Sequence, residues 1–133
     1  MLPLGVLTFV IGSLFLTNVW AVIDAKSAVT NAAREAARAY VEAPDAETGW
    51  DEARERAADA VAGHGRDPDR LALRRADGRF ARCAPVTIEA GYRLPAVVLP
   101  WIGGLGRGIT VQAVHGELVD PYRSGLPGEQ TCE

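Results

Sequence analysis

The sequence predicts an α+β protein built on one long N-terminal helix, followed by a second, short helix and a small antiparallel β-sheet. Three observations favour this layout. Residues 1–23 form an apolar run without charge, residues 24–43 are rich in alanine with helical spacing, and the hydrophobic period changes to two after residue 65. We therefore expect a transmembrane helix over 1–23, an amphipathic continuation of the same helix over 24–43, and a small α+β domain over 44–133.

The apolar run from Met1 to Ile23 has only four polar side chains, Thr8, Ser13, Thr17 and Asn18. As a helix it would extend about 34 Å, enough to cross a hydrocarbon layer of about 30 Å. The alternatives are a cleaved signal peptide and a buried core helix. A signal peptide needs a positive n-region, a shorter apolar stretch and a small-residue cleavage site, and a core helix would show a polar face. We expect a retained single-pass anchor in a lipid bilayer.

The segment from Asp24 to Ala43 has the composition of a strong helix former. Because neither proline nor glycine occurs between Gly12 and Pro44, we expect one continuous helix of about 40 residues, roughly 60 Å long. Its opposite side is charged, with pairs such as Arg38 and Glu42 spaced four apart. Its small apolar stripe should permit close helix packing, within the domain or between subunits, at five positions: Val29, Ala32, Ala33, Ala36 and Tyr40.

A second helix is expected after the turn at residues 44–49. Thr48, with Asp51 three residues later, predicts its N-cap, and Gly63 to Gly65 predict its end after Ala62. We interpret Trp50 as a core side chain and not as a ligand-binding residue.

Strands are expected after residue 65. Asp77 and Gly78 predict a tight hairpin turn between Leu71–Leu73 and Phe80. Alternation predicts half-buried strands over 86–93 and 109–113, and Gly116 predicts a bulge or a face change. The helix stripe should cover the apolar face of this sheet.

The connection from Leu94 to Gly104 is unusually apolar for a loop. Two interpretations stay open: it packs on its own sheet, or it contacts a membrane or a partner.

Cys83 and Cys132 are the two cysteines of the chain. A disulfide between them is expected if the domain lies outside the cytoplasm, and it would close a loop of about 50 residues. Two free thiols are the alternative. Two cysteines and two distant histidines are too scattered to favour a metal site.

Few residues suggest chemistry. The glycine-rich stretch Gly104–Gly108 lacks the spacing of a phosphate-binding loop and precedes a strand, so we interpret it as a hairpin loop. His64 and His115 lie far in sequence from Cys83 and Ser124, and nothing local would activate a nucleophile. We predict a non-enzymatic protein with no cofactor and no small-molecule substrate.

The charge distribution argues against nucleic-acid binding. Residues 24–65 carry nine acidic and five basic side chains, and residues 66–133 carry eight acidic and nine basic ones. Neither half has the basic excess of a nucleic-acid-binding protein. One cluster is basic, and we interpret it as a solvated hairpin surface, with contact to anionic lipid headgroups or an acidic partner as the alternative; it comprises Arg66, Arg70, Arg74, Arg75, Arg79 and Arg82.

The segment from Ala28 to Tyr40, directly after the apolar run, resembles the TadE-like family of tight-adherence pilus-assembly proteins. Members typically carry an Asn-Ala-Ala-Arg-Glu-Ala/Gly-Ala-Arg signature at this place. Eight residues match it: Asn31, Ala32, Ala33, Arg34, Glu35, Ala36, Ala37 and Arg38. The later strands, which end near Val119, fit the small extracytoplasmic domain of the family.

The resemblance implies a pilin-like fold and a role as a pilus-assembly or minor-pilin-like protein of a bacterial tight-adherence or type II secretion-like system. It implies a single pass through the cytoplasmic membrane, with the C-terminal domain outside. The implied partners are the bilayer and other pilus or secretion-system subunits, among them further copies of this chain. An alternative function is a membrane-tethered binding module of cell-envelope or secretion machinery that never enters a pilus.

Family members commonly begin with a basic leader, a processing site and a Glu near the start of the apolar run. This sequence opens at Met1-Leu2-Pro3. We expect either that the true start lies upstream or that the chain is a divergent member that is not processed like a pilin.

Overall fold

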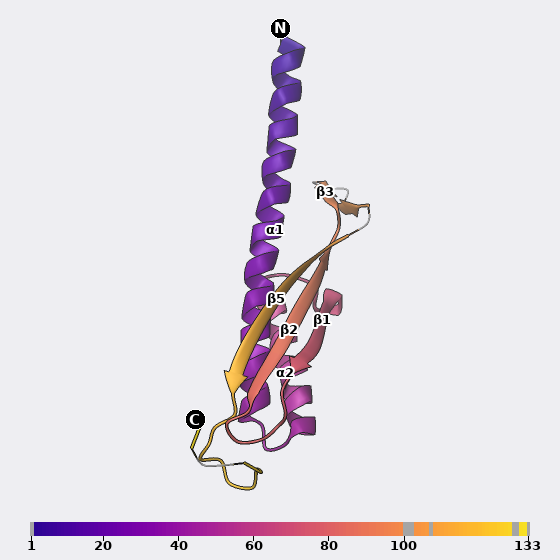
Figure 1. The fold of residues 1–133 in the computed structure, drawn as a ribbon. Helices are drawn as coiled ribbons and strands as arrows, with labels where there is room; N and C mark the ends of the chain where they lie inside the picture. The colour runs from indigo at the N-terminus through magenta and orange to yellow at the C-terminus, as the bar shows by residue number, and fades with distance from the viewer. Residues whose placement is uncertain (1, 100–102, 107, 129–130, 133) are drawn as a thin grey trace.

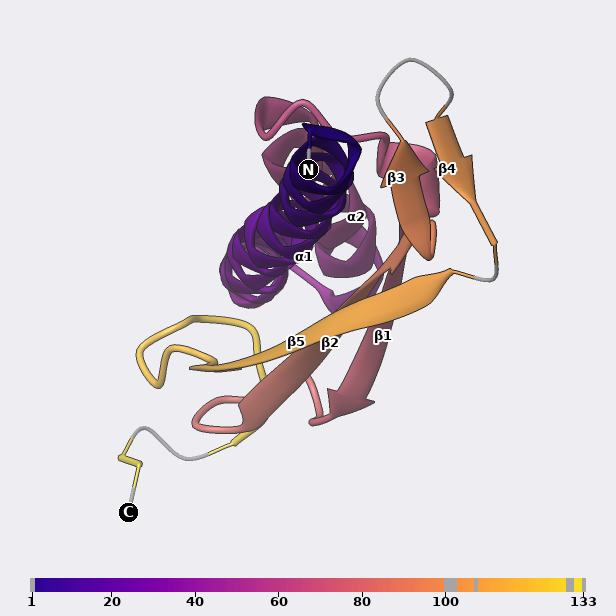
Figure 2. The same ribbon diagram turned by 90° about the horizontal axis from the view of Figure 1, so that it is seen from above.

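A layer of two helices packs on one face of a small antiparallel sheet (Figures 1 and 2). The computed structural model describes residues 2–99, 103–106, 108–128 and 131–132. The elements follow one another in this order: α1 (Leu2–Glu42), α2 (Ala46–Gly63), the 3-10 helix η1 (Pro68–Arg70), β1 (Leu71–Asp77), β2 (Pro85–Leu94), β3 (Val97–Leu99), β4 (Gly103–Leu105) and β5 (Ile109–Leu118). The expected α+β layout is confirmed.

Helix α1 shows that the apolar run and the alanine-rich segment form one continuous element. The absence of proline and glycine between Gly12 and Pro44 removes the usual causes of a kink. The start of the helix projects beyond the rest of the chain (Figure 1), and large side chains of its N-terminal half are exposed, as for Phe9 at 75% and Phe15 at 67%. The C-terminal half, in contrast, lies inside the domain.

Small side chains place the C-terminal half of α1 at the centre of the core. The fully buried positions of this half recur every three to four residues: Ala25, Ala28, Val29, Ala32, Ala33, Ala36, Ala37 and Tyr40. On α2, Ala53 and Ala57 are equally buried, and a Cβ on Gly49 would lie only 2.9 Å from the backbone oxygen of Tyr40. The two helices therefore pack closely because small residues face each other.

Helix α2 begins earlier than the sequence pattern predicted. Asp45, and not Thr48, is the N-cap: its Oδ1 accepts the backbone N–H groups of Glu47 at 3.0 Å and Thr48 at 2.9 Å. The Thr48 hydroxyl donates to the other carboxylate oxygen of Asp45. The prediction was wrong because a carboxylate directly after Pro44 can accept two free N–H groups of the first turn, which leaves Thr48 inside the helix.

The Asp45 cap predicts an acid-sensitive step in stability. The hydrogen bonds from Thr48, first from its backbone and then from its side chain, lower the pKa of Asp45 below the ordinary value of 3.8. Because the folded-state pKa is the lower one, this stabilisation is complete above the ordinary pKa and is lost as the pH falls through the folded-state pKa. Thermal unfolding followed by circular dichroism should therefore show a melting temperature that declines below about pH 4.

Asp45→Asn is the matched control for this step, because asparagine also caps a helix but does not titrate. We expect the melting temperature of the variant to fall less steeply below pH 4 than that of the original chain. Its helix content at pH 7 should be unchanged. An identical decline in both proteins would show that other carboxylates control the transition.

The main sheet has the strand order β1-β2-β5, with all neighbours antiparallel. On the face toward the helices, β2 buries Val86, Ile88, Ala90 and Tyr92, as the alternation predicted. Helix α1 contacts β2 and β5, whereas α2 contacts β1. The prediction that the helix stripe covers the sheet is therefore confirmed.

The connection between β1 and β2 is longer than the predicted tight turn. Strand β1 ends at Asp77 and β2 begins at Pro85, so Phe80 lies in the connection and not on a strand. Its ring packs edge-on against Tyr40, with the ring centroids 5.4 Å apart. Packing of this aromatic ring into the core overrides the local Asp-Gly turn signal.

The bulge or face change predicted at Gly116 is wrong. The β2–β5 ladder runs without a register shift from Leu94↔Ile109 to Pro85↔Leu118, and Gly116 pairs directly with Thr87. The irregularity of this sheet lies in β1 instead, between Arg75 and Asp77.

The apolar connection between β2 and β5 contains a second, separate ladder. Strands β3 and β4 pair antiparallel, with Val97 opposite Leu105 and Leu99 opposite Gly103. Residues 100–102 of this connection and Arg107 lie outside the described residues. Local pairing thus replaces part of the loop expected over 94–104.

Candidate functional site

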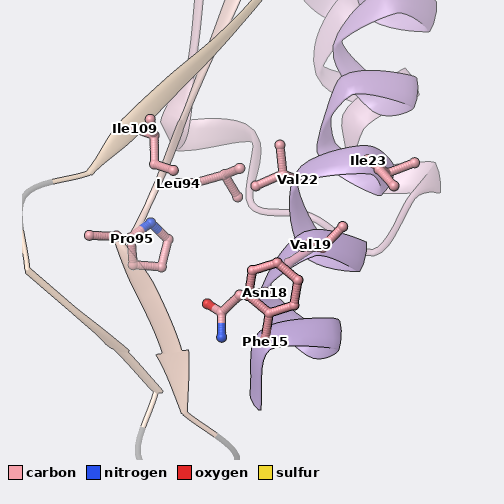
Figure 3. A pocket seen from close by; sticks show the side chains of 10 residues that line it. Phe15, Asn18, Val19, Val22, Ile23, Leu94, Pro95 and Ile109 are labelled. Carbon is pink, nitrogen blue, oxygen red and sulfur yellow. The ribbon is translucent and has the colours of Figure 1, made fainter. Parts of the chain in front are cut away.

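The candidate site is the junction where α1 leaves the domain and passes the end of the sheet. An apolar pocket of about 310 Å³ lies there, between α1 and the segments at the end of β2 and the start of β5 (Figure 3). Its lining comes from two places in the chain: Phe15, Asn18, Val19, Ala21, Val22 and Ile23 on α1, and Leu94, Pro95, Ala96 and Ile109 near the sheet. The junction therefore combines the last turns of the apolar run with the most apolar connection of the domain.

An ion pair between Asp24 and Arg66 lies at the end of this junction where the apolar run stops. Asp24 is the first charged residue of the sequence, and its Oδ2 accepts hydrogen bonds from Arg66 Nη2 at 2.6 Å and Arg66 Nε at 3.0 Å. Arg66 also donates to the backbone oxygen of Ala21 and lies over the ring of Tyr92. The Arg66 side chain is only 15% exposed, so its guanidinium group is held in place where the apolar run ends.

Removal of Asp24 should destabilise the domain because it leaves the guanidinium of Arg66 without its carboxylate. We expect Asp24→Ala to lower the free energy of unfolding by about 1 to 2 kcal/mol in detergent solution. Arg66→Met keeps an apolar side chain over Tyr92. The double variant should lose less free energy of unfolding than the two single variants lose together. The difference, which is the coupling energy of the pair, should be about 1 kcal/mol or more. Simple additivity in denaturant titrations would contradict a direct interaction.

Residues 31–38, which resemble the TadE-like signature, divide between the core and the surface. Ala32, Ala33, Ala36 and Ala37 are fully buried, whereas Asn31, Arg34, Glu35 and Arg38 are exposed. Asn31 Nδ2 lies 3.0 Å from His64 Nε2 at the end of α2. The hydrogen bond from Arg38 Nε to Glu42 Oε1, at 2.9 Å, raises the pKa of Arg38, and the charges of Glu42 and Glu35 add to this effect.

The five expected packing positions Val29, Ala32, Ala33, Ala36 and Tyr40 are all 0% exposed in the single chain. Of the two interpretations left open by the sequence, packing within the domain is therefore the one that the structure displays. Any surface that meets another subunit must use other residues, such as the exposed apolar half of α1.

The two cysteines form a disulfide, Cys83–Cys132, with the Cα atoms 5.2 Å apart. It joins the β1–β2 connection to the C-terminal tail. The same two segments also meet through the backbone N–H of Arg82, which donates to Pro127, and through its side chain, which donates to the backbone oxygen of Arg123. The disulfide interpretation is confirmed, and the free-thiol alternative is excluded for this structure.

A contact that the sequence did not reveal joins this tail to the end of α1. The guanidinium of Arg123 donates to the backbone oxygens of Val41 and Glu42, which are among the carbonyl groups left unpaired at a helix C-terminus. The participants are 82 and 81 residues apart in the sequence. No local pattern indicates such a pair, because both carbonyl groups belong to the backbone.

The arginines of the basic cluster have several different partners. Arg66 pairs with Asp24, Arg70 with Asp67 and Arg74 with Glu89. Arg75 donates to the hydroxyl of Tyr40 at 2.6 Å, and Arg82 binds the tail. Most of these arginines are therefore used in contacts within the domain.

No group of three or more histidine, cysteine, aspartate or glutamate side chains that could hold a metal ion occurs in the described part of the chain. His64 and His115 remain on separate elements: His64 contacts Asn31, and His115 contacts Glu117 at 3.0 Å.

Among the described helices, one is long and apolar enough to cross a membrane; this helix covers Pro3–Glu42, and its most apolar stretch is not buried in the domain. Comparisons with family models, curated proteins and solved structures found no match to this chain.

Proposed function

We propose that this chain is a non-enzymatic, membrane-anchored subunit of a pilus-assembly or secretion-like apparatus. One observation carries the proposal: a single helix is exposed and apolar in its N-terminal half and forms the core of a small domain in its C-terminal half. An exposed helix of this composition is stable in lipid or against other apolar helices. The resemblance of residues 31–38 to the TadE-like signature supports the assembly role.

The domain would lie on the extracytoplasmic side of the cytoplasmic membrane. The Cys83–Cys132 disulfide supports this orientation, because structural disulfides persist in oxidising compartments and are rare in the cytosol. The anchor would hold the domain at the membrane surface, and the exposed half of α1 would be available to the apolar helices of neighbouring subunits.

The test is a gene deletion in the source bacterium, with surface filaments counted by electron microscopy. We expect filaments to be lost and to return when the full chain is supplied. The matched control replaces residues 1–23 with an unrelated transmembrane helix of equal length. An assembly subunit that uses its anchor for helix packing should fail with this replacement, although the domain stays at the membrane.

Two outcomes would contradict the proposal. Normal filaments in the deletion strain would show that assembly does not need this chain. Full rescue by the exchanged anchor would favour the alternative function, a tethered binding module, for which the anchor acts only as an attachment.

A further inference from the structure

We propose that residues 94–99 and 103–106, which contain β3 and β4 and are called the apolar hairpin below, form a second membrane-contacting element. In this proposal the hairpin lies in the headgroup and acyl boundary of the bilayer beside the anchor. The inference rests on the proposed membrane anchoring of α1 and adds a second contact to it.

The position of the apolar hairpin is the first argument. It extends from the end of the sheet that lies nearest the projecting half of α1, whereas the C-terminus lies at the opposite end (Figure 1). Strand β3 also contacts α1 itself. A domain anchored by α1 thus presents this hairpin toward the membrane, at the end of the domain where Arg66 of the α2–β1 connection also contacts Ala21 and Asp24.

The depth of the junction is the second argument. The pocket between α1 and the sheet end reaches Phe15, which precedes the first charged residue, Asp24, by nine positions. That separation corresponds to about 13 Å along a helix. Leu94, Pro95 and Ile109 face this stretch from the domain side (Figure 3). The base of the apolar hairpin therefore lies beside a part of α1 that belongs to the apolar span.

The chemistry of the segment is the third argument. Residues 94–106 contain no charged side chain, and the sequence places an arginine on each side, Arg93 and Arg107. Arg93 is exposed. Uncharged, apolar segments bordered by arginine suit a membrane interface, because the long side chain can keep its charge in the headgroup region.

Backbone hydrogen bonding limits how deep the apolar hairpin can go. A ladder of two strands has two edges with unpaired backbone groups, which cannot be exposed to the hydrocarbon interior. An interfacial element lies only about 5 to 10 Å into the headgroup and acyl boundary. At that depth, the headgroups and water can satisfy the strand edges, and a lipid acyl chain can enter the pocket beside Val19 and Val22.

The test uses the full chain in liposomes and reads the environment of single labelled cysteines. Ala96→Cys lies in the apolar hairpin, Ala76→Cys lies at the far end of β1, and both alanines are exposed in the structure. Leu7→Cys, in the exposed half of α1, reports on the anchor alone. Each variant is labelled with the fluorophore NBD, while the native cysteines remain joined, and one label per chain is verified.

The liposomes contain phosphatidylcholine and phosphatidylglycerol, with or without bromine on the acyl chains, and iodide is present on both sides. We expect brominated lipid to reduce the fluorescence at Ala96→Cys about twofold, as at Leu7→Cys, with weak quenching by iodide. The label at Ala76→Cys should show the reverse pattern.

Three results would overturn the inference. If Leu7→Cys is quenched by brominated lipid and Ala96→Cys behaves like Ala76→Cys, the anchor is supported but the apolar hairpin does not touch the bilayer. If Ala96→Cys is shielded from iodide and brominated lipid alike, protein covers it, as a second copy of the chain would. If Leu7→Cys itself is not quenched, the anchoring proposal fails, and the inference fails with it.

Discussion

Replacing Tyr40 with alanine will lower the free energy of unfolding by about 3 to 5 kcal/mol. The ring is fully buried and packs edge-on against both Phe80, at 5.4 Å, and Trp50, at 6.4 Å. It joins α1 to α2 and to the β1–β2 connection, so its loss creates a cavity at the meeting point of three segments. The measurement is a denaturant titration of the full chain in detergent, followed by circular dichroism.

Tyr40→Phe is the matched control, because it keeps the ring and removes only the hydroxyl that accepts the hydrogen bond from Arg75. Since Arg75 is exposed and can bind water instead, we expect this variant to lose about 1 kcal/mol or less. Equal losses for the two variants would show that the hydrogen bond, and not the packing of the ring, determines the contribution of Tyr40.

Removal of the disulfide by the double variant Cys83→Ser/Cys132→Ser will lower the free energy of unfolding by about 2 to 4 kcal/mol. The bond spans a separation of 49 residues, and the chain-entropy account assigns a loop of this length about 4 kcal/mol. We expect trypsin to cleave the tail at Arg123 faster in the variant, because the tail is then held only by noncovalent contacts, such as the hydrogen bond from Arg82 and the packing of Leu126 against the core.

The same titration with a reductant gives the control. Reductant should shift the original chain to the stability of the double variant and leave the variant unchanged. In membranes without reductant, a maleimide should label neither cysteine. Labelling of both thiols under these conditions would contradict the bond.

The periodic features of the fold could be predicted from the sequence, because each one follows from local spacing. Helix α1, the buried stripe from Ala25 to Tyr40 and the inward positions of β2 are all encoded by repeats of 3.6 or 2 residues. The alternation in β5 was also visible, although a glycine at position 116 suggested a bulge that a regular ladder does not need.

The features that the sequence did not reveal depend on contacts between distant residues. Asp24 and Arg66 are 42 residues apart, and Arg123 binds backbone groups more than eighty residues away. The cap at Asp45 was missed because Thr48 also fits a capping pattern, and only the path of the chain after Pro44 decides between them. The β3–β4 ladder was missed because β3 is a three-residue apolar run between two prolines and β4 has the sequence Gly-Gly-Leu, and neither is long enough to show a period.

The candidate site was foreseen in its parts but not in its geometry. The apolar run and the apolar connection were both recognised as unusual, yet the sequence could not show that Leu94 and Pro95 lie beside Phe15 and Val19. That proximity follows from the packing of α1 on β2 and β5, and the antiparallel pairing of these strands brings Leu94 and Ile109 together at one end of the sheet.

The continuity of α1 has a mechanical consequence. No flexible linker separates the projecting half of the helix from the half that packs against α2 and the sheet. In a bilayer, any tilt or rotation of the span would therefore turn the whole domain by the same angle, and a pull on the domain would act directly on the span. The tilt of the helix in the lipid would therefore determine the orientation of the domain at the membrane surface.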